Sequence, residues 1–233
     1  MSQLTEQGFA NFFKYYSEED QQKAATEILY EALLQSDPKL LEETHPWIVK
    51  YREEPPAPEY QNPIDCPYQS QLDNISGTGY RECFSSSCAM VAMYYGKIEN
   101  DDAYNAIRNN YGDSTDAQAQ LRTLRSLGLK AEFITNGTYD DLRKQIRKGR
   151  PTPVGWLHTG SAAYPTGGGH YSVILGDLGD AWVLHDPYGE ANVAAGGYIN
   201  HTGGKYVEYS YKNWNKRWAV EGDGSGWYLD VFP

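Results

Sequence analysis

The fold is decided by residues 82–96, which read Glu82-Cys-Phe-Ser-Ser-Ser-Cys-Ala-Met-Val-Ala-Met-Tyr-Tyr-Gly96. Five apolar side chains of this stretch form one stripe: Phe84, Cys88, Val91, Ala92 and Tyr95. Their i, i+4, i+7, i+8 and i+11 spacing is typical of a buried helix that ends at Gly96. Cys83 stands at or next to the N-cap, where unpaired backbone N–H groups and the helix dipole favour a thiolate. The stretch therefore predicts a buried helix with a reactive thiol at its start.

The other two cysteines do not stand at the start of a predicted helix. Cys88 belongs to the apolar stripe of the same helix, so we expect it to be a buried and unreactive thiol. Cys66 lies in a loop flanked by proline and has no supporting context. Three cysteines are an odd number and too few for a disulfide framework, which indicates a reducing compartment. Cys83 is therefore the candidate nucleophile.

A hairpin further along the chain supplies a candidate base for this thiol. Two predicted strands flank a turn at 176–180, and pairing that is symmetric about Leu178 places His170 opposite Asp186. Their Cβ atoms would be about 5 Å apart, close enough for an imidazole and a carboxylate to form a hydrogen bond. Such a carboxylate orients a histidine and stabilises its protonated form. The same register turns His185 to the other face, so we favour His170, although a chance His–Asp pair is the alternative that the hairpin alone leaves open.

The remaining segments of the C-terminal region divide into helices followed by strands. Helical patterns cover residues 101–110, 116–127 and a segment that starts at a capping box, and strand patterns cover 129–134, 153–158, 170–175, 182–186, 206–211 and 227–232. Helices first and an antiparallel sheet last indicate an α+β fold.

The first part of the chain has a different composition. Residues 1–65 contain one of the 23 glycines, with 5 basic and 13 acidic side chains, which is typical of helices. We therefore predict a helical region over 1–55, a proline-rich linker over 56–65 and a catalytic domain over 66–233. The negative charge of the helical region argues against adhesion to anionic polymers, and we expect the region to pack on the domain over 66–233.

Charge and hydropathy exclude several classes of function. The net charge of −11 argues against nucleic acid as a partner, and no apolar run approaches the roughly 20 residues of a membrane span. The N-terminus does not resemble a signal peptide, which indicates synthesis in the cytoplasm. Histidines and cysteines do not follow zinc spacings, and the glycine run 166–169 lacks the lysine of a phosphate loop, so we expect no metal or cofactor. The sequence indicates no particular oligomeric state.

These motifs together resemble a known family. Residues 82–96, with Gln71-Leu-Asp-Asn74 before them and His170 and His185-Asp186-Pro187 after them, are similar to the bacteriocin-processing (double-glycine leader) peptidase-like branch of the papain-like cysteine peptidases. The resemblance covers about residues 66–190. It implies a papain-like core of helices packed on an antiparallel sheet, in which Cys83 is the nucleophile and His170 and Asp186 complete a triad. It also implies that Gln71 supplies the oxyanion hole.

Three departures from the family pattern bear on function. The family has Asp-Cys-Gly where this chain has Glu82-Cys83-Phe84, and losing that glycine is expected to change how closely a substrate backbone approaches. An insertion over 74–81 lengthens the spacing between Gln71 and Cys83. The chain also lacks the fused transporter of leader peptidases, and so resembles stand-alone phage lysins and cell-wall peptidases.

This resemblance implies a peptidoglycan endopeptidase, an endolysin that a phage delivers to the cell wall through a holin or with the virion. Its substrate would be a peptide or peptidoglycan. Two alternatives stay open: a peptidase that matures a specific polypeptide, and a catalytically inactive papain-like module that binds a peptide or wall fragment.

Overall fold

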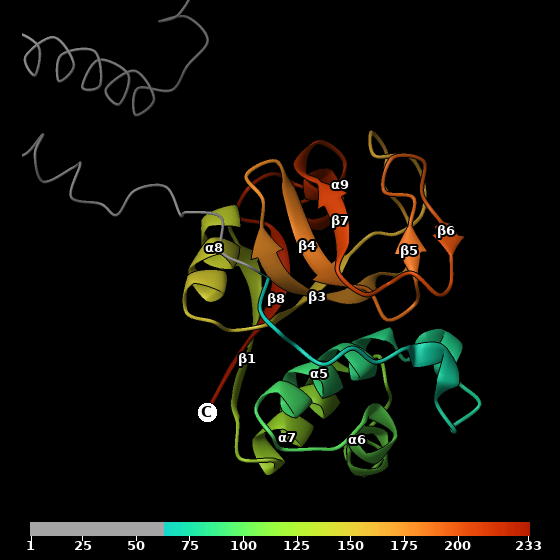
Figure 1. The fold of residues 1–233 in the computed structure, drawn as a ribbon, viewed down its shortest axis with the longest axis vertical. Helices are drawn as coiled ribbons and strands as arrows, with labels where there is room; N and C mark the ends of the chain where they lie inside the picture. The colour runs from blue at the N-terminus through green and yellow to red at the C-terminus, as the bar shows by residue number, and fades with distance from the viewer. Residues whose placement is uncertain (1–62) are drawn as a thin grey trace, which may run out of the picture. The chain divides into compact units, whose positions relative to one another are not determined.

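The computed structural model describes residues 63–233 (Figure 1). The helices predicted within 1–55 and most of the linker predicted over 56–65 lie outside the described residues. The last linker residues are described, and the backbone N–H of Ile64 donates to the carbonyl oxygen of Leu175 at 2.9 Å. The chain therefore enters the domain along a strand of the central sheet.

The described elements follow the predicted order of helices and strands. They are η1 (Gln71–Asp73), η2 (Gly79–Arg81), α5 (Cys83–Tyr94), α6 (Asp101–Arg108), α7 (Ala117–Ser126), β1 (Lys130–Gly137), α8 (Tyr139–Arg147), β2 (Thr152–Trp156), β3 (His170–Asp177), β4 (Ala181–His185), β5 (Glu190–Ala191), β6 (Tyr198–Asn200), β7 (Val207–Ser210), α9 (Tyr211–Trp218) and β8 (Gly226–Phe232). The sequence patterns did not predict η1, η2, α9 or the short strands β5 and β6. The capping box at Thr138 is present at the start of α8.

Six strands form an antiparallel sheet in the order β1-β8-β2-β3-β4-β7, and β5 and β6 pair separately. Helices α5, α6 and α7 lie together on one side of the large sheet (Figure 1). Alternate residues of β3 serve two cores, since Val173 and Leu175 pack with α5 whereas Ile174 packs with α8 and α9. Helices packed on an antiparallel sheet confirm the predicted α+β papain-like fold.

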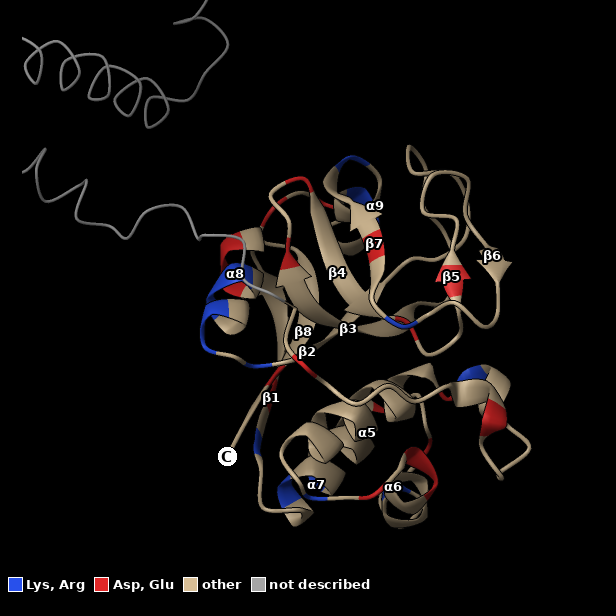
Figure 2. Cartoon of the chain, in the orientation of Figure 1, with Lys and Arg blue, Asp and Glu red and all other residues tan. Residues whose placement is uncertain are grey.

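Helix α5 is more deeply buried than its apolar stripe predicted. Every residue from Phe84 to Ala92 is buried, because the helix lies between the sheet and the other two helices. Two of its three serines form side-chain hydrogen bonds: Ser85 accepts from Gln120 at 2.9 Å and Ser86 donates to Asp101 at 2.7 Å. Figure 2 shows α5 without charged side chains, whereas α8 carries both signs. The start of α5 is thus held rigidly by its surroundings.

The predicted register of the β3–β4 hairpin is wrong by two residues. Val173 pairs with His185 and Ile174 with Leu184, and the ladder then shifts at a bulge before Gly176. The prediction centred the turn on Leu178, but the pairs Gly176–Val183 and Asp177–Trp182 centre it between Gly179 and Asp180. The bulge before Gly176 then shifts the rest of the ladder by one residue. Because side chains alternate with a period of two, a two-residue slip keeps each side chain on its predicted face.

Candidate active site

Cys83 is the first residue of α5, immediately after the N-cap residue Glu82. Its side chain is partly exposed, whereas Cys66 and Cys88 are buried. Burial, with a smaller contribution from Asp65, raises the pKa of Cys66 to about 12, and burial raises that of Cys88 well above its ordinary value. Cys83 is therefore the thiol best placed to react, in the position expected from the sequence.

His170 and Asp186 lie together despite the register shift. Nε2 of His170 is 2.7 Å from Oδ1 of Asp186, and both side chains are buried. Burial by itself would lower the pKa of His170, but the negative charges of Asp186 and of an ionised Cys83 outweigh burial and raise it. Because Asp186 occupies Nε2, Nδ1 is the ring nitrogen left to face Cys83.

Asp186 is fully buried just beyond the end of β4, and several donors stabilise its charge. The backbone N–H of Tyr188 donates to Oδ1 at 3.0 Å, and the Tyr209 hydroxyl donates to Oδ2 at 3.0 Å. The Tyr198 hydroxyl lies 3.5 Å from both oxygens. A buried carboxylate needs such partners to stay ionised. The sequence patterns did not identify Tyr198 and Tyr209, since they come from separate strands, β6 and β7, and nothing local marks them.

Gln71 is buried in η1, next to both halves of the site. Its backbone N–H donates to the carbonyl oxygen of Pro187 at 2.9 Å, and its Nε2 donates to that of Gly79 at 2.6 Å. A Cβ atom at Gly79 would lie 2.0 Å from the carbonyl oxygen of Gln71, so only glycine fits there. Gln71 thus connects the residue after Asp186 to the turn before Cys83. The Nε2 amide carries two hydrogens, and the bond to Gly79 uses one of them, so the other remains available as a donor.

His185 lies on the opposite face of the sheet. Its Nδ1 accepts from the backbone N–H of Tyr206 at 3.0 Å, and its Nε2 therefore donates to the carbonyl oxygen of Cys66 at 2.9 Å. Burial lowers its pKa to about 4, so the ring is neutral at physiological pH. Both ring nitrogens bind backbone, and neither is free for a substrate.

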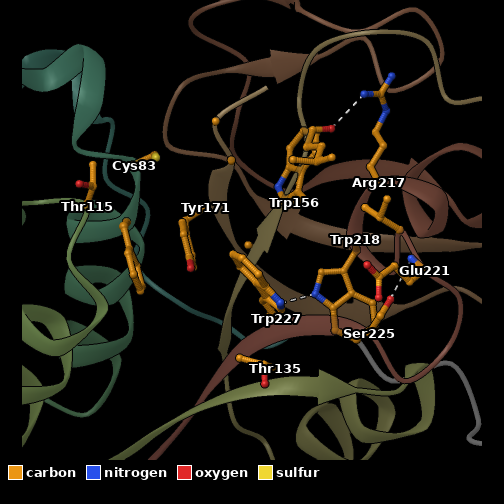
Figure 3. A pocket seen from close by; sticks show the side chains of 16 residues that line it. Cys83, Thr115, Thr135, Trp156, Tyr171, Arg217, Trp218, Glu221, Ser225 and Trp227 are labelled. Atoms are coloured by element: carbon orange, nitrogen blue, oxygen red, sulfur yellow. Dashed lines mark hydrogen bonds between the residues drawn. The ribbon is translucent and has the colours of Figure 1, made fainter. Parts of the chain in front are cut away.

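A groove of about 560 Å³ starts at Cys83. Its aromatic lining consists of Phe84, Trp156, Tyr171, Trp218 and Trp227. Figure 3 shows Cys83 on one side of the groove and Trp218, Glu221 and Ser225 on the other. The ring of Phe84, at the position of the family glycine, is buried and stacks on Tyr171 with 3.6 Å between centroids. Phe84 is therefore part of the groove wall.

Within residues 63–233, no group of three or more His, Cys, Asp or Glu side chains is arranged to hold a metal ion. None of the helices in the described part of the chain has the length and apolar character needed to cross a membrane.

The fold and this site define a cysteine peptidase of the papain-like class. The model of the family described as papain-like cysteine protease AvrRpt2 matches residues 60–198, more than half of the chain. The chain belongs to this family, which confirms the papain-like resemblance recognised in its motifs. None of the curated proteins compared with the chain matches it.

Three solved structures that are similar to the chain have low sequence identity to it. A protein from Bacillus anthracis described as a C39-like peptidase is 14% identical with a TM-score of 0.51, over 74% of this chain and 98% of its own. A double glycine motif protease from an AMS/PCAT transporter, solved with its leader peptide, is 20% identical with a TM-score of 0.46, over 74% and 95%. The peptidase domain of Streptococcus ComA is 17% identical with a TM-score of 0.45, over 66% and 93%.

Proposed function

We propose that this cysteine peptidase cleaves its substrate with a Cys83–His170–Asp186 triad and an oxyanion hole that includes Gln71. The observation that carries the proposal is the 2.7 Å bond between His170 Nε2 and Asp186 Oδ1, which leaves Nδ1 available to the thiol at the start of α5. The raised pKa of His170 favours an imidazolium, the partner that a thiolate needs.

The first half of the reaction follows from this geometry. The Cys83 thiolate attacks the carbonyl carbon of a peptide bond, and a C–S bond forms while the carbonyl oxygen becomes an oxyanion. The free N–H of Gln71 and the backbone N–H of Cys83 stabilise that oxyanion. The C–N bond then breaks, the His170 imidazolium gives its proton to the leaving amine, and a thioester remains on Cys83.

The second half returns the enzyme to its starting state. Neutral His170 takes a proton from water, and the resulting hydroxide attacks the thioester carbon. The C–S bond breaks, the substrate leaves as a carboxylic acid, and the proton on His170 again pairs with the Cys83 thiolate. Asp186 keeps its Oδ1 on His170 Nε2 throughout and stabilises the imidazolium.

Replacement of Gln71 by alanine tests the oxyanion role. We expect kcat to fall by about 10²- to 10³-fold with little change in KM, because the lost donor acts mainly in the transition state. The matched control is Gln120→Ala, which removes another buried amide bonded to α5 at Ser85. Unchanged kcat in Gln71→Ala, with a melting temperature lowered as in Gln120→Ala, would exclude the role.

Alkylation tests the choice of thiol. We expect iodoacetamide to label Cys83 in the folded protein and to leave Cys66 and Cys88 unmodified, since those thiols are buried and their pKa values are raised. Peptide mass spectrometry after a short reaction identifies the labelled residue. Denatured protein, in which all three cysteines should react, is the control. Equal labelling of Cys66 or Cys88 in the native state would contradict this expectation.

The groove favours a polypeptide with apolar side chains as substrate. Besides the site itself, the charged residues of its lining are Arg217 and Glu221. The Arg217 guanidinium donates to the carbonyl oxygens of Leu157, Thr159, Gly160 and Val193, so it is not available to a substrate carboxylate. A specific polypeptide is therefore the substrate that the site supports best, and its maturation is the function that follows.

Peptidoglycan is the second candidate, and the half-exposed Trp227 in the groove wall supports it, because an indole face can stack on a sugar ring. An endolysin role would include the holin-dependent or virion-associated delivery that the resemblance implies. Purified sacculi and a library of peptides should each be digested with the wild type and with Cys83→Ala, and new termini identified by mass spectrometry. Cleavage of sacculi alone supports an endolysin, cleavage of peptides alone supports maturation, and binding without any cleavage supports an inactive module.

A further inference from the structure

The second carboxylate oxygen of Asp186 has a dedicated donor. Tyr209 in β7 is 2% exposed, and its hydroxyl lies 3.0 Å from Oδ2 of Asp186. The same hydroxyl oxygen accepts the backbone N–H of Ala191 at 2.8 Å. Because Ala191 is a donor, the hydroxyl hydrogen is directed to Asp186.

This contact determines how the carboxylate is turned. A carboxylate held at both oxygens cannot rotate about its χ2 angle without losing a bond, and Oδ1 is shared by His170 Nε2 and the backbone N–H of Tyr188. Oδ2 has Tyr209 as its close donor, since Tyr198 is 3.5 Å away. Tyr209 therefore keeps Oδ1 aimed at His170.

We propose that Tyr209 is a positioning residue of the peptidase site, which stabilises the ionised, correctly turned carboxylate of Asp186 and through it the His170 imidazolium. This inference rests on the proposed triad. Burial and the neighbouring Asp186 raise the pKa of Tyr209 above its ordinary value, so the hydroxyl is a donor at neutral pH. The other titratable groups facing this pair are His158, His170, Tyr68, Tyr188, Tyr198, Glu190 and, through His170, Cys83.

The test follows the rate of Cys83 alkylation by iodoacetamide as a function of pH in the full-length protein. In Tyr209→Phe the ionised Asp186 is less stable, His170 is less well stabilised as an imidazolium, and the thiolate loses support at low pH. We expect the midpoint of the alkylation profile to move to higher pH by about one unit. Tyr198→Phe, which removes the more distant hydroxyl, should move it less.

Tyr104→Phe is the matched control. Tyr104 is fully buried in α6, and its hydroxyl donates to Gln120 Oε1 at 2.9 Å, away from Asp186. It should lower the melting temperature without moving the alkylation midpoint. A Tyr209→Phe profile that coincides with wild type, alongside a comparable loss of stability, would overturn the proposal.

A second variant tests the proposal if Tyr209→Phe does not fold. Incorporation of 3-fluorotyrosine at position 209 keeps the hydroxyl and makes it a stronger donor, so the midpoint should move to lower pH; no movement overturns the proposal. The readout needs no peptide substrate. Failure of the triad would appear as a wild-type profile that His170→Ala leaves unchanged, whereas failure of the Tyr209 role leaves the His170 effect intact.

Discussion

Cys83→Ala is expected to abolish peptide-bond cleavage, lowering kcat/KM by about 10⁴-fold or more. The reason is chemical: without the thiol there is no thioester intermediate, and what is left of the site can bind a substrate but not attack it. Cys83→Ser should be nearly as inactive, because a hydroxyl is much harder to ionise beside His170 than a thiol. Turnover of a peptide identified in the library screen is the measurement.

Cys88→Ala is the control for this prediction. It removes a thiol from the same helix, but one that is fully buried in the core. It should cost some stability through the cavity it leaves while kcat/KM stays within a few-fold of wild type. Full activity in Cys83→Ala would show that Cys83 is not the nucleophile.

Asp186→Asn is expected to lower kcat/KM by about 10³- to 10⁴-fold and to narrow the active pH range. Asp186 raises the pKa of His170 against the effect of burial. When the negative charge is lost, burial dominates and the pKa of His170 falls, so the imidazolium loses its proton at a lower pH. The alkaline limb of the kcat/KM profile should therefore move to lower pH.

Asp101→Asn is the matched control for Asp186→Asn. Asp101 is another buried carboxylate, and it accepts a hydrogen bond from Ser86 at 2.7 Å on the helical side of the domain. Burial raises its pKa to about 6, so the substitution also removes a buried ionisable group. It should leave the alkaline limb in place. An alkaline limb that stays fixed in Asp186→Asn would mean that His170 does not set it.

Much of the site could be predicted because its parts are local. The spacing of apolar residues after Cys83 determines a helix, and a helix start places this thiol next to free N–H groups whatever the rest of the chain does. The same pattern predicts that Cys88 is buried and that Cys83, at the helix start, is not. The alternation of β3 and β4 put His170 and Asp186 on one face, and a period of two kept them there when the predicted register proved wrong by two residues.

The groove could not be predicted in the same way. Helix α9 was missed, although Trp214, Arg217 and Trp218 recur at helical spacing, because strand-forming aromatic residues surround them. Trp218 and Trp227 reach the groove from elements that meet only in the folded sheet. Phe84 was expected to change how closely a substrate backbone approaches; in the structure its ring stacks on Tyr171 and lines the groove, a contact that no local pattern predicts.

The sequence by itself determined the α+β class, the buried helix that starts at Cys83 and the face that carries His170 and Asp186, since each depends on residues close together in the chain. Only the tertiary structure decided the hairpin register, the donors on Asp186 and the lining of the groove. These depend on which strands pair and where a bulge falls, and β7 brings Tyr209 beside Asp186 only after the sheet has formed. The free energy that selects this pairing comes from burial across the whole domain, which no local pattern records.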